Sequence, residues 1–281
     1  MSRTLSRDRE GMILINVLFV VAVAMIVVVM MVTTQDVAID RTARFRDAAQ
    51  ATAYARAGEA SVIVALRRDA VEAPDSDHPG EPWGAVEDRD VAIRGGRFSV
   101  TVVDDQARFN LNSLRTGDLA AEALLARVLD ALGLSGDLFE PILAHVRVSG
   151  PVESLEEFTI VGVDPDDIQT LSQLATVLPG ETTINLNTAD ERLLAVIFDS
   201  PVTARLVDSA RRRRGYLSPA DLAALNAPAP PGTGFTSDFY TVETDMMIGT
   251  TRQRTASALR RRTSPEGVEV VVYGRQRLPA D

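Results

Sequence analysis

The chain has no cysteine, and its 281 residues include only two histidines. Without cysteine it has no disulfide framework, no thiol nucleophile and no cysteine metal site. His78 and His145 are far apart in the sequence, and neither is part of a known catalytic motif; a lone histidine is usually structural or solvated. We therefore expect a protein that is not an enzyme.

Basic residues are scarce relative to acidic ones: 29 against 39, which gives a formal net charge of -10. Binding to nucleic acid phosphates is driven by basic surface. An acidic chain of this kind fits a soluble head outside the cytoplasm. We expect no nucleic acid partner.

Proline is absent from residues 12–68, and Gly58 is the only glycine there. This predicts one continuous helix of roughly 85 Å at 1.5 Å per residue. Its second half is rich in alanine, and a small apolar stripe can pack closely on a sheet. The stripe expected to pack consists of residues at helical spacing: Ala49, Ala53, Ala57, Ala60 and Val64.

The first half of this helix lacks charge from Met12 to Gln35. Such a run exceeds the roughly 20 apolar residues needed to cross a bilayer. The preceding residues 1–10 contain three arginines, and basic residues favour the cytoplasmic side. These features predict a single-pass membrane protein with a cytoplasmic N-terminus and the bulk of the chain outside the cytoplasm; the resemblance described below implies that the membrane is the inner membrane and that the bulk of the chain is periplasmic.

The apolar run directly follows a polar leader that ends in glycine, at Gly11. A secretory signal would instead have a shorter apolar core with its cleavage site on the far side. The arrangement resembles type IV pilins and pseudopilins, in which a prepilin peptidase cuts after the glycine and methylates the new terminal amine, here that of Met12. A simple signal anchor remains the alternative.

The fifth residue after this predicted cleavage is Asn16, where the pilin-like families usually have glutamate. A carboxylate in hydrocarbon is costly and needs a partner. In a filament, that partner is taken to be the terminal amine of a neighbouring subunit. Asn16 forgoes this ion pair, which fits a subunit at the filament tip, where one longitudinal neighbour is missing.

Beyond the helix, the pattern changes twice. A loop at 73–83 leads to a strand at 97–103, and residues 117–225 are mainly helical. Capping-box spacing marks two helix starts, Ser154 with Glu157 and Thr188 with Glu191. After a linker rich in proline and glycine, four strands are predicted at 239–243, 246–252, 253–261 and 268–275.

The predicted fold class is α+β: a pilin-like head, with the long N-terminal helix packed on a small antiparallel sheet, interrupted by a large inserted all-α domain. The expected division of the chain is a leader (1–11), a transmembrane and assembly helix (12–35), the first part of the pilin-like domain (36–112), the inserted domain (113–226) and the C-terminal strands (227–281).

Four segments in this order resemble one family, the general secretion pathway protein K minor pseudopilins of type II secretion systems. They are GMILINVLFV, RFSVTVVDDQARFNLNSL, SLEEFTIVGVDPDDIQTL and LPGETTINLNTADERLLAVI. The resemblance implies an insertion of two repeats similar to SAM or helix-hairpin-helix units. It also implies a role in capping the pseudopilus and starting its assembly, which supports export of folded proteins across the outer membrane. The implied partners are minor pseudopilins of the I and J types, the major pseudopilin, the inner-membrane assembly platform and prepilin peptidase.

Calcium is associated with this family, and Asp164, Asp166 and Asp167 are candidate ligands because they offer oxygen atoms. The plainer interpretation is an acidic helix N-terminus that complements the helix dipole. The chain also departs from the family at 142–151, where an acidic loop is shortened.

Two other functions stay open. Residues 184–225 resemble a helix-hairpin-helix DNA-binding module, which would suggest DNA uptake, but the hairpin at 198–201 has no glycine and carries an acidic residue. Four arginines at 211–214 could attract phosphate, or simply end a helix. The other alternative is a minor pilin of a type IV pilus, which would share the leader but not be expected to carry the helical insertion.

Overall fold

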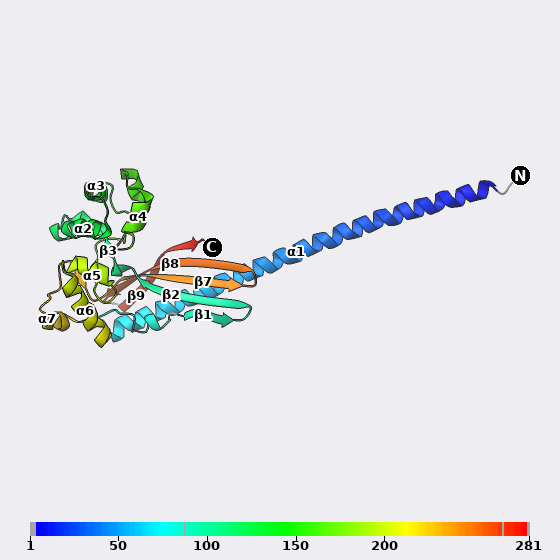
Figure 1. Cartoon of the computed structure of the whole chain (residues 1–281). Helices are drawn as coiled ribbons and strands as arrows, with labels where there is room; N and C mark the ends of the chain where they lie inside the picture. The colour runs from blue at the N-terminus through cyan, green and yellow to red at the C-terminus, as the bar shows by residue number, and fades with distance from the viewer. Residues whose placement is uncertain (1–3, 87, 266, 280–281) are drawn as a thin grey trace.

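The computed structural model describes residues 4–86, 88–265 and 267–279, with the side chains of the first helix described from Ile15 onward. That helix, α1 (Thr4–Glu72), has 69 residues and a length of roughly 100 Å. Figure 1 shows it projecting far beyond the rest of the protein toward the N-terminus. The prediction of one long helix is confirmed.

In the described part of the chain, five antiparallel strands form the main sheet, in the order β1-β2-β7-β8-β9. Their bounds are β1 (Asp88–Ile93), β2 (Gly96–Asp104), β7 (Phe239–Ile248), β8 (Thr251–Ser264) and β9 (Gly267–Leu278). Strand β2 therefore pairs with β7 across an interval of more than a hundred residues of sequence. This pairing is what places the helical segment between them as a separate block at one end of the sheet (Figure 1).

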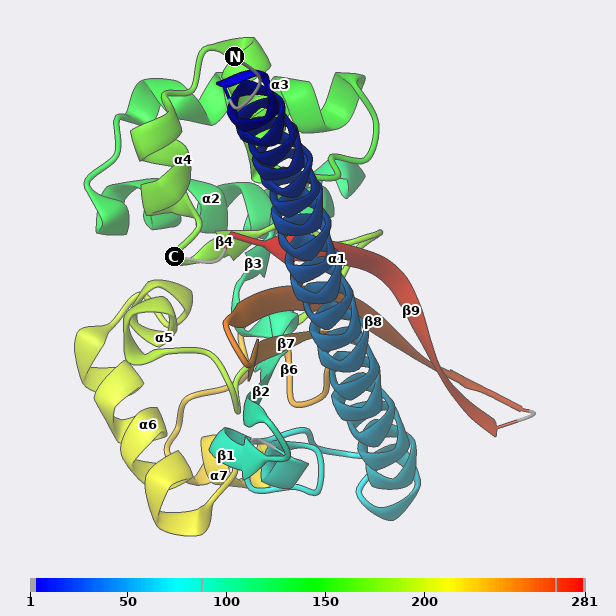
Figure 2. The same cartoon turned by 90° about the vertical axis from the view of Figure 1, so that its right-hand side faces the viewer.

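The second half of α1 packs on one face of this sheet. Buried Val62 and Leu66 share a core with Tyr240, Val242 and Leu259 from the strands. Nearer the membrane half, Ala51 joins Met246 and Ile248 in a smaller cluster. Figure 2 shows α1 passing along the sheet on this side.

The predicted packing stripe was wrong. Ala49, Ala53, Ala57, Ala60 and Val64 are all exposed. The helix instead buries a stripe two residues further along, which includes Ala51, Ala55, Gly58, Val62 and Leu66. Alanines lie on every side of this helix, so they did not mark the buried face.

The strand boundaries near the C-terminus also needed correction. The structure has one strand from Phe239 to Ile248, where a break after Glu243 was predicted. The turn to β8 lies at Gly249, whose φ of 55 suits glycine, and not at Arg252. Strand β1 was not predicted, because its sequence DRDVAI is too polar to show alternation over its length.

Helices dominate the block between β2 and β7. They are α2 (Leu119–Leu132), α3 (Phe139–Val148), α4 (Pro165–Leu171), α5 (Glu191–Ile197), α6 (Pro201–Arg214) and α7 (Pro219–Ala224), with 3₁₀ helices at Asp105–Ala107, Leu111–Thr116, Gly136–Leu138 and Leu155–Val161. Two short parallel pairs lie among them: β3 (Phe109–Asn110) with β4 (Ala175–Thr176), and β5 (Ile184–Asn185) with β6 (Thr233–Gly234).

This helical block has its own hydrophobic core, separate from the core under α1. It includes Leu125, Ile142, Phe158, Leu171 and Leu194, each almost fully buried. The two bodies therefore meet mainly through other contacts, which are described below. The boundaries predicted at 112 and 226 stay predictions, and so does the pair of SAM-like or helix-hairpin-helix-like repeats.

Candidate functional site

Two parts of the molecule bear on function: the free half of α1, and the polar junction between the sheet and the helical block. From Ile15 to Val32 the side chains of α1 point into solvent, although they are overwhelmingly apolar. Among the described residues, this helix is long and apolar enough to cross a membrane, with a mean hydropathy of 3.1 over its most apolar window. The geometry fits a single-pass membrane anchor.

The predicted processing site lies near the start of this helix. Residues 1–3 of the leader lie outside the described residues; Gly11 and Met12 lie within the helical backbone of α1, ahead of the described side chains. Asn16 is exposed, among apolar neighbours on the free half of the helix. Cleavage, methylation and the role of Asn16 stay predictions.

The helical block contains two Asn-x-Asn motifs in equivalent settings. In the first, the Asn110 side chain accepts the amides of Asn112 and Leu178 and donates to the carbonyl of Gly180 at 2.8 Å. Asn112 exchanges two hydrogen bonds with the backbone of Val152, at 2.8 and 2.9 Å. Each motif begins at the last residue of the first strand of a short parallel pair, and its asparagines hydrogen-bond distant loops to the start of a helical segment.

The second motif has the same local pattern. The Asn185 side chain accepts the amide of Asn187 at 2.9 Å, and Asn187 accepts the amide of Leu217 at 2.6 Å. Its outward partners differ, however. Asn185 Nδ2 donates to the carbonyl oxygen of Asp77 at 2.9 Å and to Asp104 Oδ2 at 2.9 Å, both outside the helical block.

Asp104, at the end of β2, is the centre of this junction. Its carboxylate accepts hydrogen bonds from the amide of Gln106 at 2.8 Å, Asn185 Nδ2 at 2.9 Å, Thr188 Oγ1 at 2.6 Å and Ser237 Oγ at 2.7 Å. Burial raises the pKa of Asp104 to about 6, and the four donors hold it from rising further. At neutral pH, Asp104 is thus a buried anion with its hydrogen bonds satisfied.

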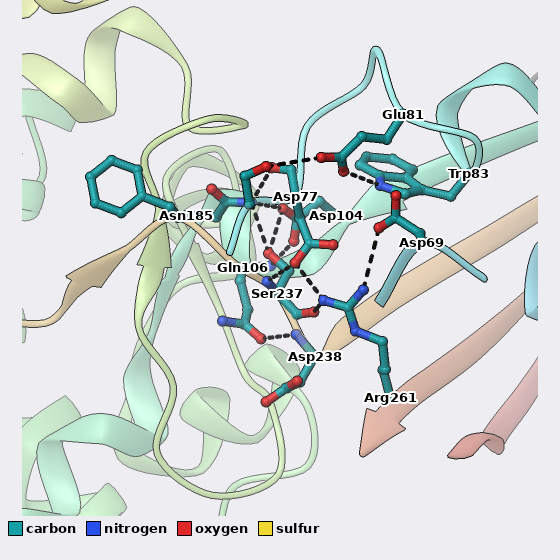
Figure 3. A network of polar contacts seen from close by, with 12 residues as sticks. Asp69, Asp77, Glu81, Trp83, Asp104, Gln106, Asn185, Ser237, Asp238 and Arg261 are labelled. Carbon is teal, nitrogen blue, oxygen red and sulfur yellow. Dashed lines mark hydrogen bonds and ion pairs between the residues drawn. The ribbon is translucent and has the colours of Figure 1, made fainter. Parts of the chain in front are cut away.

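A second acidic group lies beside it, around the end of α1. Arg261 of β8 forms ion pairs with Asp69 at 3.5 Å and with Asp77, and donates to the carbonyl of Ser237 at 2.6 Å. Burial, followed by the nearby charges of Glu81 and Asp77, raises the pKa of Asp69 to about 8. Figure 3 shows these residues converging from α1, the loop after it, β8 and the segment before β7.

Glu81 completes this acidic group from the loop that follows α1. It accepts hydrogen bonds from Ser76 Oγ at 3.1 Å, the amide of His78 at 2.9 Å and Trp83 Nε1 at 3.1 Å. The His78 ring lies 3.2 Å from the Glu81 carboxylate and stacks on Tyr216 of the helical block. The loop predicted at 73–83 is thus an ordered bridge between the two bodies.

The candidate calcium ligands are elsewhere and are not brought together. Asp164 is the N-cap of α4, and its carboxylate accepts the amide of Asp166 at 3.0 Å. Asp166 is exposed, and Asp167 is half-buried in the first turn. In the part of the chain that the structure describes, the three carboxylates whose oxygens lie within 4.8 Å of one another are those of Asp69, Asp77 and Glu81.

Two capping predictions had different outcomes. The capping box of Ser154 and Glu157 is present. The one predicted for Thr188 is wrong: Asp190 caps α5, because its side chain accepts the amide of Leu193, while Thr188 turns its hydroxyl to Asp104.

The arginines at 211–214 are largely engaged. Arg211 and Arg212 pair with Asp208 at 2.6 Å, and Arg214 pairs with Asp221 at 2.6 Å. Arg211 also donates to the backbone carbonyls of Leu186 and Ala189, in the loop before α5. These contacts support a structural role for the end of α6.

A cleft of about 670 Å³ separates the uncovered face of the sheet from the helical block. Thr241, Ala256 and Tyr273 line one side, and Val152 and Thr176 line the other. The two bodies therefore touch along only part of their facing surfaces, and the polar junction is where they are joined.

Sequence reasoning did not find this junction. No motif or spacing in the sequence links Asp69, Asp77 and Glu81 with one another or with Asn185. The one available signal was Trp83, the only tryptophan of the chain, since a large aromatic residue in a loop rich in proline and glycine indicates that the loop is packed against something.

The long exposed apolar helix fits a single-pass membrane anchor, and its packing on an antiparallel sheet with a separate helical block gives a pilin-like fold. No protein-family model matches the chain. Type II secretion system protein K of Pseudomonas aeruginosa is 26% identical over 91% of this chain and 90% of its own length. The protein of that name from Klebsiella pneumoniae is 25% identical over 96% of this chain and 98% of its own length.

Among solved structures, the GspK-GspI-GspJ complex from enterotoxigenic Escherichia coli contains a chain with the same overall fold. The TM-score is 0.65 at 20% sequence identity, covering 85% of this chain and all of the matched chain. The chain is thus similar over nearly its whole length to type II secretion system protein K, and these relatives together with the shared fold support a minor pseudopilin of that secretion system.

Proposed function

We propose that this minor pseudopilin caps the tip of the pseudopilus and starts its assembly. The observation that carries the proposal is the position of the helical block, which lies beyond the sheet at the end opposite to the N-terminus of α1 (Figure 1). In a filament whose subunits stack through their N-terminal helices, a bulky block at this end leaves the helix free for subunits below. It obstructs the place where a subunit above would add.

Asn16 supports the same position. A tip subunit has no neighbour above it, so a carboxylate that reaches for that neighbour's terminal amine would stay unpaired in hydrocarbon. An uncharged amide avoids most of this cost. Asn16 lies on the free, apolar half of α1, where such a contact would form.

The proposed partners are minor pseudopilins of the I and J types, and the matched solved structure is a complex of such proteins. Because the anchor is pilin-like, the proposed partners also include the major pseudopilin, the inner-membrane assembly platform and prepilin peptidase. We place the anchor in the inner membrane, the N-terminus in the cytoplasm and the head in the periplasm. The protein acts as a structural subunit and not as an enzyme.

We also propose that the helical block consists of two copies of one unit, similar to SAM or helix-hairpin-helix domains. Each copy would begin at an Asn-x-Asn motif next to a short parallel strand pair. Each would also contain a capping box, at Ser154 in the first and at Ser218 in the second. The engaged arginines of α6 argue against DNA binding by the second copy. A gel-shift titration at low salt should find no tight, salt-sensitive binding.

Labelling of assembled pseudopili tests the tip position. Antibodies against the helical block should mark one end of each filament, whereas antibodies against the major pseudopilin should mark its whole length. Label from the helical block along the filament would refute the proposal. Co-purification of the full chain from detergent with two other minor pseudopilins provides the independent test of its partners.

A further inference from the structure

The acidic group around the end of α1 has too little positive charge for its burial. Asp69, Asp77 and Glu81 are 0%, 1% and 7% exposed, and Asp104 lies next to them at 5%. Facing these four carboxylates are Arg261 and the ring of His78. Buried charges persist in proteins when they are paired or bind a metal, because removing an ion from water is costly.

Two oxygens of this group also lack any partner. Among the described residues, Asp69 Oδ1 and Asp77 Oδ1 are buried without a hydrogen bond, although the other oxygen of each carboxylate faces Arg261. In Figure 3, the Asp69 carboxylate turns one oxygen to Arg261 and the other toward Glu81 and Trp83. A buried carboxylate oxygen left unsatisfied costs free energy, so a bound cation, or a proton shared by the two aspartates, would stabilise this arrangement.

We propose that Asp69, Asp77 and Glu81 bind one hard divalent cation, such as calcium, magnesium or manganese. One oxygen from each lies within 4.8 Å of the others, which fits a common centre. The three proposed ligands are all carboxylate oxygens, the type these ions prefer. Water completes the coordination. The site is distinct from Asp164 and its neighbours at the start of α4.

The cation would have a structural effect at this position. Asp69 lies in the last turn of α1, whereas Asp77 and Glu81 belong to the loop that carries the chain toward β1. The same loop supplies the Asp77 carbonyl that Asn185 of the helical block binds. A bound ion therefore fastens the end of the long helix to the bridge that holds the helical block.

Trp83 makes the site measurable, because its indole nitrogen lies 3.1 Å from Glu81 Oε2 and the chain has no other tryptophan. The experiment uses the full chain in detergent, treated with a chelator and then moved to metal-free buffer. Terbium(III), a hard luminescent ion, is titrated with excitation at the red edge of tryptophan absorption, where tyrosine contributes little. We expect sensitised terbium emission that calcium, magnesium or manganese displaces. The midpoint of thermal unfolding should rise with the concentration of the displacing ion.

Asp69→Asn is the decisive variant. Asparagine keeps the shape and can donate to Asp77 Oδ1, so the variant should fold without metal, yet terbium emission should fall at least tenfold and the metal-dependent rise in the unfolding midpoint should disappear. Glu81→Gln can retain the hydrogen bond from Trp83, and it should show the same loss of terbium emission and of the metal-dependent rise in the unfolding midpoint. The matched control is Asp166→Asn, an exposed acid outside the group, which should keep the full response.

Two results would overturn the inference. Equal emission from Asp69→Asn and the parent would place the bound ion elsewhere. The other result has two parts: the folded parent gives no terbium emission, and Asp69→Asn unfolds at a higher temperature than the parent both in chelator and in metal. It would show that Asp69 and Asp77 share a proton and bind no cation. Neither result bears on the tip proposal, because filament labelling does not depend on this site.

Discussion

Replacing one atom should break the junction between the two bodies: the change Asn185→Asp converts the donor Nδ2 into a carboxylate oxygen. That nitrogen lies 2.9 Å from the Asp77 carbonyl oxygen, 2.9 Å from Asp104 Oδ2 and 3.0 Å from Ser237 Oγ. Asn185 is fully buried, so water cannot replace the lost donor. Its other oxygen, which accepts the amide of Asn187, keeps its role in the variant.

The expected cost has two parts. A hydrogen bond to a charged acceptor contributes about 1.5–3 kcal/mol and one to a neutral acceptor about 1 kcal/mol, so losing the amide costs about 2.5–4 kcal/mol. Two unit charges about 3 Å apart repel by roughly 5 kcal/mol at an effective dielectric constant of about 20, and the variant can avoid part of this by taking up a proton. We expect Asn185→Asp to lower the free energy of unfolding by about 5 kcal/mol at pH 8, and by about 3 kcal/mol at pH 5.

The matched control is Asn185→Ala, which removes the amide without adding charge and should cost about 3 kcal/mol at both pH values. Urea titrations of the full chain in detergent, followed by the fluorescence of Trp83, measure both variants at the junction itself. The difference between aspartate and alanine isolates the repulsion and should vanish on acidification. A difference below about 1 kcal/mol at pH 8, or one that does not depend on pH, would mean that Asp104 is not the charged partner assigned to it.

Three further changes test other parts of the molecule. Gly11→Val should block leader processing and secretion, so N-terminal sequencing should no longer find Met12 first, whereas Asn16→Glu should be less harmful; complete loss of secretion from Asn16→Glu alone would contradict the reason given for the missing carboxylate. The pKa of Asp104 is about 6 when folded and near 3.9 in an unfolded chain, so the folded state holds more protons between these values. The contribution of Asp104 to stability should therefore fall by about 3 kcal/mol as the pH rises from about 4 to 6. The urea midpoint should fall more steeply over this range in the parent than in Asp104→Ala, whose remaining loss comes from other buried acids such as Asp69. Gly96→Ala should destabilise the protein by about 1–3 kcal/mol in thermal melts, because the added Cβ would lie 1.7 Å from the carbonyl oxygen of Met247 on the paired strand; an unchanged melt would refute the register of β2 and β7.

The length of α1 could be predicted from sequence, but its buried face could not. The absence of proline determines where a helix can continue, and here the structure agrees. The buried face depends on contrast between apolar and polar sides, and the alanines of this helix provide little. Val64 is 63% exposed, whereas Val62 and Leu66 are fully buried, a distinction that only the position of the sheet makes.

The junction could not be predicted for a different reason. Asn185 meets Asp77 across 108 residues of sequence and Asp104 across 81, and no local pattern encodes such a meeting. Asp164, Asp166 and Asp167 were candidate calcium ligands because they are neighbours along the chain. In the structure Asp164 is instead the N-cap of α4. Residues that meet through tertiary structure, such as Asp69 and Arg261, require the strand pairing of β7 and β8 to be known first.

The unequal division of α1 between free and clamped lengths makes it a lever. Its contact with the sheet and the turns at the sheet's edge runs from Asp47 to Asp69, roughly 33 Å, while the part from Thr4 to Arg46 extends for about 63 Å. A sideways force on the membrane end is therefore balanced at the sheet by forces roughly twice as large, because the free length is about twice the length in contact. The helix is then more than an anchor. A sideways force on its membrane end exerts a torque on the sheet and on the helical block beyond it.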